Sequence, residues 1–157
     1  MYTRVTQIDF SGFESGTQGW TFGGSDGDRS NKRSNVDDSG VLGGTWSAHL
    51  QDDSSTSEFL KNFDFAGGYS HVNISFGYYP KSIDNNEYVQ LLCDGVEVWR
   101  FTKGAHGQNA WFSTKVKVEI TDCNFDSSVE IKFEGNPGLS GNSDDIWVDG
   151  INITGIL

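Results

Sequence analysis

Residues that could act in catalysis are few, and their spacing matches no familiar catalytic site. The three histidines, His49, His71 and His106, form neither a His-x-His pair nor the spacing of a zinc protease. The sequence has no Gly-x-Ser-x-Gly nucleophile elbow. With 22 acidic residues, some carboxylate pair will meet the separation needed for glycoside hydrolysis by chance. We therefore expect a protein that binds rather than catalyses, with a glycan hydrolase or lyase domain as the least favoured alternative.

Acidic side chains dominate the charge of the chain. There are 22 Asp and Glu residues against 11 Lys and Arg, which gives a net charge of -11. Such a surface repels phosphate backbones, so we do not expect nucleic acid as a partner. The carboxylates offer many oxygen ligands for a hard cation such as calcium. The alternative is that they only keep the protein soluble.

Aromatic residues make up 13% of the chain and are the candidates for contact with a ligand. Exposed rings are stacking platforms in carbohydrate-binding surfaces, whereas a ring taken singly more often packs in a core. We expect Trp20 in the core and Trp46 and Trp111 to be the most exposed tryptophans. The full set of candidate ligand-binding residues is Trp46, Trp111, Tyr79, Tyr88, Gln90 and Trp99.

Alternation of apolar and polar residues marks the elements that must position these side chains. It runs through six segments: 74–79, 88–93, 96–102, 111–120, 129–134 and 146–149. A period of two is that of a strand with one packed face, and repeated strands of this kind indicate an antiparallel β-sandwich or barrel. Asp94-Gly95 predicts a tight hairpin. The charged faces of 111–120 and 129–134 are expected to lie side by side, with opposite charges paired.

The remaining features bound the organisation of the chain. Its 157 residues suit one all-β module, 1–157, with a core of about 10–154. The stretch 23–44 is rich in Gly, Ser, Asp and Asn and predicts a long loop with at most one short strand. Cys93 and Cys123 either form a disulfide or stay as two buried thiols. No apolar run approaches the ~20 residues of a membrane span.

The order of short motifs resembles a known class of module. Phe13-Glu14-Ser15-Gly16 is followed by Gly19-Trp20, and the chain closes on Asp145-Ile146-Trp147-Val148-Asp149-Gly150-Ile151. This order resembles the MAM-like and carbohydrate-binding-module-like jelly rolls of secreted proteins. Those often open with Phe-Glu and Gly-Trp and close on two aspartates separated by three apolar or aromatic residues. MAM domains usually carry four cysteines, and this chain has two, so the resemblance implies a MAM-like jelly roll rather than a true MAM domain.

The resemblance also implies a structural calcium ion. In these jelly rolls the opening glutamate and the late aspartates often join one site, so the candidates here are Glu14, Asp145 and Asp149, with Asp53 as a weaker one. Calcium takes six to eight oxygen ligands. Asp145 and Asp149 would lie ~13 Å apart in a regular strand, so both bind one ion only if a bulge intervenes. Asp145, at the strand mouth, is the better candidate. The alternative is that these acids cap turns or face solvent.

These observations predict a non-catalytic carbohydrate-binding module of a secreted or cell-surface protein, with a structural Ca²⁺ ion and a polysaccharide or glycan as its partner. A protein–protein adhesion or assembly module that contacts other extracellular proteins is the alternative. No signal peptide follows Met1, so for an exported protein we expect an excised module with an added initiator methionine.

Overall fold

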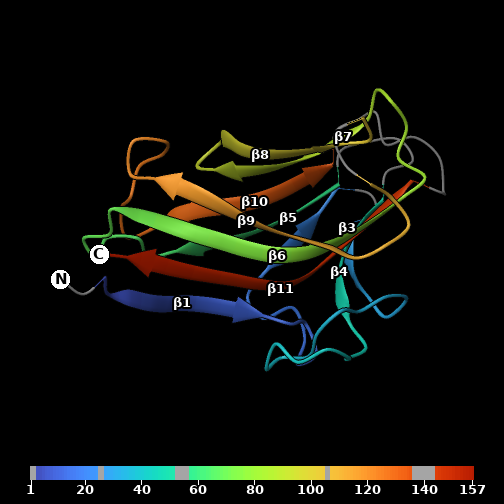
Figure 1. Ribbon diagram of the computed structural model, residues 1–157, viewed down its shortest axis with the longest axis horizontal. Helices are drawn as coiled ribbons and strands as arrows, with labels where there is room; N and C mark the ends of the chain where they lie inside the picture. Colours follow the sequence, from blue (N-terminus) through green and yellow to red (C-terminus); the bar gives the residue numbers. More distant parts are fainter. Residues whose placement is uncertain (1–2, 25–26, 52–56, 105–106, 136–143) are drawn as a thin grey trace.

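The computed structural model describes residues 3–24, 27–51, 57–104, 107–135 and 144–157. These residues form two antiparallel sheets that face each other as a β-sandwich (Figure 1). The predicted all-β sandwich is therefore confirmed. No stretch of the described residues forms a helix with the length and apolar character needed to cross a membrane.

The sheet that carries both ends of the chain is called sheet A. Its strands are β1 Val5–Ser11, β3 Gly27–Ser30, β4 Ser47–Gln51, β6 His71–Lys81, β9 Phe112–Glu119 and β11 Asp145–Ile156. They run in the order β3-β4-β11-β6-β9, with β1 also paired to β11. Val5 at the start of β1 pairs with Ile156 at the end of β11, so the two termini lie at the same end of the sandwich (Figure 1).

The facing sheet is called sheet B. Its strands are β2 Thr21–Gly23, β5 Ser57–Phe63, β7 Tyr88–Cys93, β8 Val96–Thr102 and β10 Val129–Gly135, in the order β2-β5-β10-β7-β8. The predicted hairpin joins β7 to β8. Asp94 and Gly95 have φ of 46° and 80° there, which is the left-handed backbone that a tight two-residue turn requires.

Aromatic side chains fill the space between the sheets. Phe59 and Phe133 stack at 4.8 Å between ring centroids, and Trp20 packs against Phe59 at 5.3 Å. Trp20 is 2% exposed, which confirms its predicted place in the core. Large rings bury about 150–250 Å² each, so a chain with only 35% hydrophobic residues still closes a continuous core.

Two predictions about the strands need correction. Segments 111–120 and 129–134 are not neighbours, because β9 pairs with β6 in sheet A and β10 lies between β5 and β7 in sheet B. Their charged side chains therefore point outward from opposite faces of the sandwich. The last strand is also much longer than 146–149, since β11 continues to Ile156 beyond an irregularity that apolar alternation alone does not bridge.

That irregularity is a bulge between Asp149 and Asn152. Before it, Ile146 and Val148 face the core, and after it Ile151 and Ile153 do so, so the inward parity changes from even to odd. Gly150 has φ of 62°, and a Cβ there would lie 2.7 Å from Val36 Cγ2. The bulge thus requires glycine for its backbone and for the close approach of the 31–46 segment.

The bulge is also where β11 changes partners. On one side, β6 accompanies β11 along its length, whereas on the other side β4 pairs with 145–148 and β1 pairs with 151–156. Between the ends of β4 and β1, the edge of β11 at Asp149 pairs with neither strand. This leaves room for the loop between β3 and β4, which is the 31–46 segment, to dock there.

Cys93 and Cys123 form a disulfide, which settles the choice that the sequence left open. The bond joins the end of β7 in sheet B to the turn that follows β9 in sheet A. It therefore ties the two sheets together at that end of the sandwich.

We predict that replacing both cysteines with alanine lowers the free energy of unfolding by about 3–4 kcal/mol, because the bond closes a loop of 30 residues and limits the unfolded chain. Urea unfolding of the oxidised protein and the double variant measures this difference. The reduced wild-type protein should match the variant. Equal midpoints for the oxidised protein and the variant would contradict a stabilising role.

Candidate functional site

Asp149 stands at the β11 bulge and binds the docked loop. The residue is fully buried, and its Oδ2 accepts hydrogen bonds from the backbone amides of Asn35 at 2.8 Å and Val36 at 3.1 Å. Its Oδ1 accepts the amide of Gly150 at 2.8 Å. Burial raises the pKa of Asp149 to about 6, although these hydrogen bonds act to lower it. The carboxylate is thus desolvated but surrounded by donors.

Glu14, from the turn after β1, approaches the same loop from its other side. Its Oε1 accepts the backbone amides of Thr45 at 2.6 Å and Trp46 at 2.9 Å. The Ser34 hydroxyl lies between the two acids, 3.4 Å from Glu14 Oε1 and 3.1 Å from Asp149 Oδ2. The first and last strands are therefore joined through one serine side chain.

Backbone oxygens complete a cluster around this hydroxyl. Ser34 Oγ also lies 3.3 Å from the carbonyl oxygens of Val36 and Gly43. A hydroxyl has one proton and can satisfy only one of these four acceptors well. A Cβ on Gly44 would lie 2.5 Å from Glu14 Oε1 and 2.7 Å from Val36 O, so only glycine allows the chain to close here. We call Glu14, Ser34, Val36, Gly43 and Asp149 the oxygen cluster.

The oxygen atoms of the cluster are suitable ligands for a hard cation. Two carboxylates, a hydroxyl and two carbonyls are the ligand types that calcium takes. Backbone amides donate to both carboxylates, whereas the Ser34 hydroxyl has a single proton for its four neighbouring acceptor oxygens. Glu14 and Asp149 lie on the same serine, and Glu14 with Asp149 is one of the two ligand pairs that the resemblance implies, the other being Glu14 with Asp145.

Asp145, the candidate preferred from the sequence, has different surroundings. Its Oδ1 lies 2.6 Å from Nε2 of His49, whose Nδ1 lies 2.7 Å from Asp28 Oδ1. Burial lowers the pKa of His49, but the hydrogen bonds from Asp145 and Asp28 outweigh it and raise the pKa above its usual value. Asp145 is therefore the partner of a histidine. Asp53 lies outside the described residues.

An aromatic cluster lies on the outer face of sheet A near the strand ends. Tyr79 packs edge-on against Trp111 at 5.8 Å and against Trp147 at 5.9 Å between ring centroids. The Arg33 guanidinium lies over Tyr79 at 4.0 Å and over Trp147 at 4.9 Å. Trp147 is 3% exposed, whereas Tyr79 and Trp111 are only partly buried. Tyr79 and Trp111 are thus the two accessible rings of this cluster.

The other candidate ligand-binding residues lie elsewhere. Tyr88 and Gln90 are on β7 in sheet B, where Arg100 covers Tyr88 at 3.7 Å and Gln90 donates to Glu134 at 2.9 Å. Trp99 packs against Phe76 at 5.1 Å between the sheets.

Trp46 is partly buried beside the oxygen cluster, with Arg29 over its ring at 3.9 Å. The structure therefore brings Tyr79 and Trp111 together on sheet A and keeps Tyr88 and Gln90 together on sheet B, while Trp46 and Trp99 lie apart from both pairs.

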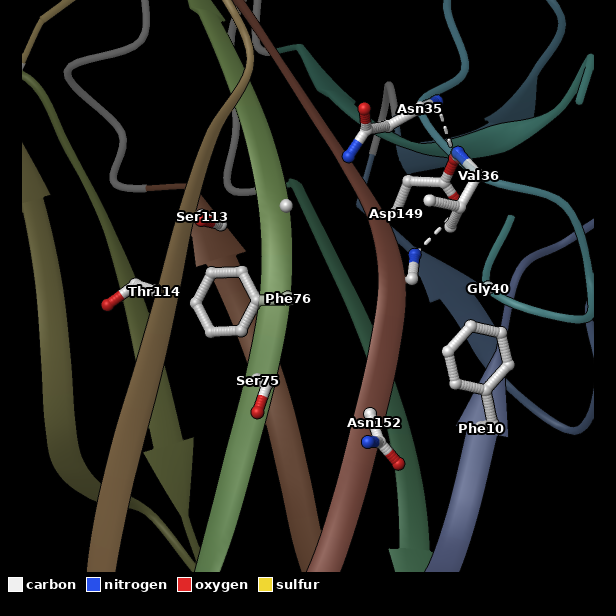
Figure 2. Close-up of a pocket in the computed structure, with 12 residues that line it drawn as sticks. Phe10, Asn35, Val36, Gly40, Ser75, Phe76, Ser113, Thr114, Asp149 and Asn152 are labelled. Carbon is white, nitrogen blue, oxygen red and sulfur yellow. Dashed lines mark hydrogen bonds between the residues drawn. The ribbon is translucent and has the colours of Figure 1, made fainter. Parts of the chain in front are cut away.

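A hollow of about 270 Å³ lies over β6, β9 and β11 (Figure 2). Its lining includes small residues on β6 and β9, namely Ser75, Gly77 and Ser113, and the side chains of Asn35 and Phe10 (Figure 2). Tyr79 is two residues from Gly77 and Trp111 is two residues from Ser113, so each ring lies on the same face as the hollow. The hollow and the aromatic cluster form one surface, which we call the sheet A face.

Several residues of this site were not identified from the sequence. Arg33, Ser34 and Asn35 all come from the stretch 23–44, which was predicted only as a long loop. The signal available was the length of that loop, because long loops in compact domains are often functional. No spacing within it indicated which of its residues would reach β11.

Comparisons with known proteins define the fold and leave the function open. No protein-family model matches the sequence, and no curated protein is similar enough to show a relationship. Among solved structures, the CBM22-1 xylan-binding domain of Paenibacillus barcinonensis Xyn10C aligns over 94% of this chain and 93% of its own, with 14% identity and a TM-score of 0.59.

Two further structures extend the comparison. A family 11 carbohydrate-binding module of Clostridium thermocellum, solved with a β-1,3-1,4-mixed-linked tetrasaccharide, covers 95% of this chain and 94% of its own, at 14% identity and a TM-score of 0.57. The Stig cyclase Fisc of Fischerella sp. TAU covers 96% and 98%, at 10% identity and a TM-score of 0.63. None of the three is a MAM domain. The chain shares the β-sandwich of carbohydrate-binding modules and of an enzyme.

We predict that the contribution of His49 to stability depends on pH. Because its pKa is raised in the folded protein, the two hydrogen-bonded carboxylates stabilise the protonated ring below its unfolded pKa of about 6.5, and this stabilisation is lost as pH rises through the higher folded value. His49→Gln should therefore lower the melting temperature more at pH 5.5 than at pH 9. Melting curves across this range test the prediction, and His71→Gln, at the half-buried start of β6, is the control. A deficit that does not change with pH would contradict it.

Proposed function

We propose that this protein is a non-catalytic carbohydrate-binding module of a secreted or cell-surface protein, and that it binds polysaccharide on the sheet A face. The observation that carries the proposal is the position of Tyr79 and Trp111 on the same face as a hollow whose lining combines small and polar residues with apolar ones such as Phe10 and Val36. Aromatic rings that are exposed together on one surface often mark a binding site, whereas single exposed rings need no explanation.

The chemistry of the sheet A face suits neutral sugars. An aromatic ring presents an apolar surface to the C–H face of a sugar, and Asn35, Ser113 and Asn152 supply donors and acceptors for hydroxyl groups. A net charge of -11 disfavours strongly anionic glycans. Gly77 allows the Asn35 side chain to lie close over β6, because a Cβ there would be 2.8 Å from Asn35 Nδ2.

The comparisons support this proposal without extending beyond the fold. One similar structure is a xylan-binding domain and another was solved with a mixed-linkage tetrasaccharide. The cyclase of the same fold shows that a β-sandwich can also carry catalysis. The choice of a binding function therefore rests on the side chains of the sheet A face.

We further propose that the oxygen cluster holds a structural calcium ion. Its two carboxylates would supply charge, and Ser34 with the carbonyls of Val36 and Gly43 would supply neutral oxygens. The ion would join the turn after β1, the 31–46 segment and the β11 bulge. Because Arg33 and Asn35 flank Ser34, the same ion would support the loop residues that border the sheet A face.

Replacing Tyr79 or Trp111 with alanine should weaken polysaccharide binding about tenfold or more, because loss of a well-packed aromatic contact at a binding site costs at least ~1.4 kcal/mol. Affinity gel electrophoresis with xylan and mixed-linkage β-glucan measures this. Tyr88→Ala, on the outer face of sheet B, is the matched control and should bind as the wild type does.

Three outcomes would count against a binding module on this face. Binding that is lost in Tyr88→Ala but kept in Tyr79→Ala would place the ligand on sheet B. Release of reducing ends during incubation would indicate a hydrolase. Absence of glycan binding together with concentration-dependent self-association would favour the adhesion module.

Calcium should raise the melting temperature by about 5–10 °C over a chelator when present at about 100 times its dissociation constant, since that excess corresponds to ~2.7 kcal/mol. Glu14→Gln should reduce this gain because it removes one ligand charge while preserving size. Glu130→Gln, on β10 in sheet B, is the control that loses the same charge. A full gain in Glu14→Gln would show that the oxygen cluster does not hold the ion.

A further inference from the structure

Three carboxylates outside the oxygen cluster meet where β6 leads into its connection to β7. Asp84 and Glu87 lie in that connection, and Asp144 immediately precedes β11. Each of the three offers a carboxylate oxygen, and these oxygens all lie within 4.8 Å of one another. No sequence pattern links these residues, because they come from two segments some 60 positions apart.

The fold holds these carboxylates in place. Asp145 pairs with Lys81 across β11 and β6, so Asp144 lies beside the turn that follows β6. Within the turn, the amide of Asp84 donates to Glu87 Oε2 at 2.6 Å. Ile83 is fully buried, and the Gln108 side chain bonds both its amide and its carbonyl, at 2.6 and 3.1 Å. The arrangement is therefore built into the packing of the loops.

One oxygen of Asp144 has no hydrogen-bond partner within the described part of the chain. Glu87 and Asp144 are each only 3% exposed, and Asp144 Oδ2 is buried without a hydrogen-bond partner among the described residues. The ion pairs formed by the described residues include neither Asp84 nor Asp144. Burial, followed by the adjacent Glu87, raises the pKa of Asp144 to about 6. A buried carboxylate of this kind is costly unless a proton or a cation offsets its charge.

We propose that Asp84, Glu87 and Asp144 bind a second calcium ion, separate from that of the oxygen cluster. Asp144 is five positions from Asp149 along the chain, which in extended strand is ~16 Å and too far to share one ion. Hard oxygen ligands favour calcium or magnesium, and calcium accepts irregular ligand sets of six to eight oxygens completed by water or carbonyls. The ion would join the β6–β7 connection to the start of β11.

The three carboxylates are connected to the sheet A face through His49. The next residue, Asp145, bonds to His49, and His49 stacks on Trp147 at 4.9 Å between ring centroids. An ion at Asp144 would therefore brace the end of β11 from which the aromatic cluster projects. This does not depend on glycan binding, so the second ion can be tested even if the proposed function fails.

Equilibrium dialysis of the full chain against radioactive calcium tests the proposal by counting bound ions. The wild type should bind two, Asp84→Asn and Asp144→Asn should each bind one, and Glu14→Gln should retain the second site. Asp84 is exposed, so Asp84→Asn is expected to fold even if the buried variant does not. Asp126→Asn, in a turn before β10, is the matched control and should bind two.

Two results would overturn the proposal. One is an unchanged number of bound ions in both Asp84→Asn and Asp144→Asn. The other is that Asp144→Asn raises the melting temperature equally in calcium and in chelator, which would mean that a shared proton, and not a metal, offsets the charge. Loss of one ion in Glu14→Gln with none lost in Asp84→Asn would support the oxygen cluster alone.

Discussion

The interaction on which this structure depends is the one between Asp149 and the loop between β3 and β4. At the bulge, β11 leaves β4 and begins to pair with β1, so a stretch of its edge faces no strand. The buried carboxylate fills that gap by accepting the amides of Asn35 and Val36. Without this partner, the loop would expose backbone donors over a buried strand edge, and such groups are costly to leave unpaired.

The docked loop determines what the outer face of sheet A looks like. Arg33 precedes Ser34 and lies over the rings of Tyr79 and Trp147, while Asn35 follows it and borders the hollow. A single serine thus separates the residue that covers the aromatic cluster from the one that lines the hollow. Neighbouring residues of this loop contribute to the oxygen cluster and to the sheet A face. Interactions that hold Ser34 in the oxygen cluster therefore also hold Arg33 and Asn35 at the sheet A face.

The two sheets differ in what their outer faces offer. On sheet B, Tyr88 is partly buried under Arg100 and Gln90 bonds to Glu134. On sheet A, Tyr79 likewise lies under Arg33, but Trp111 packs against it as a second partly exposed ring and a hollow lies on the same face. Binding modules and a cyclase share this sandwich, and differences of this kind between surfaces are what separate functions on one fold.

The sequence by itself determined the all-β sandwich, the hairpin at Asp94-Gly95 and the burial of Trp20, because these depend on a period of two, on local turn chemistry and on the bulk of one ring. The resemblance to jelly-roll modules implied in addition that Glu14 and a late aspartate meet. Only the tertiary structure placed Asp149 beside Ser34 and Glu14 and Asp145 beside His49, paired Cys93 with Cys123, and separated Tyr88 from Tyr79. The physical reason is that strand order and one bulge decide which faces and which distant segments adjoin, and neither leaves a periodic signal along the chain.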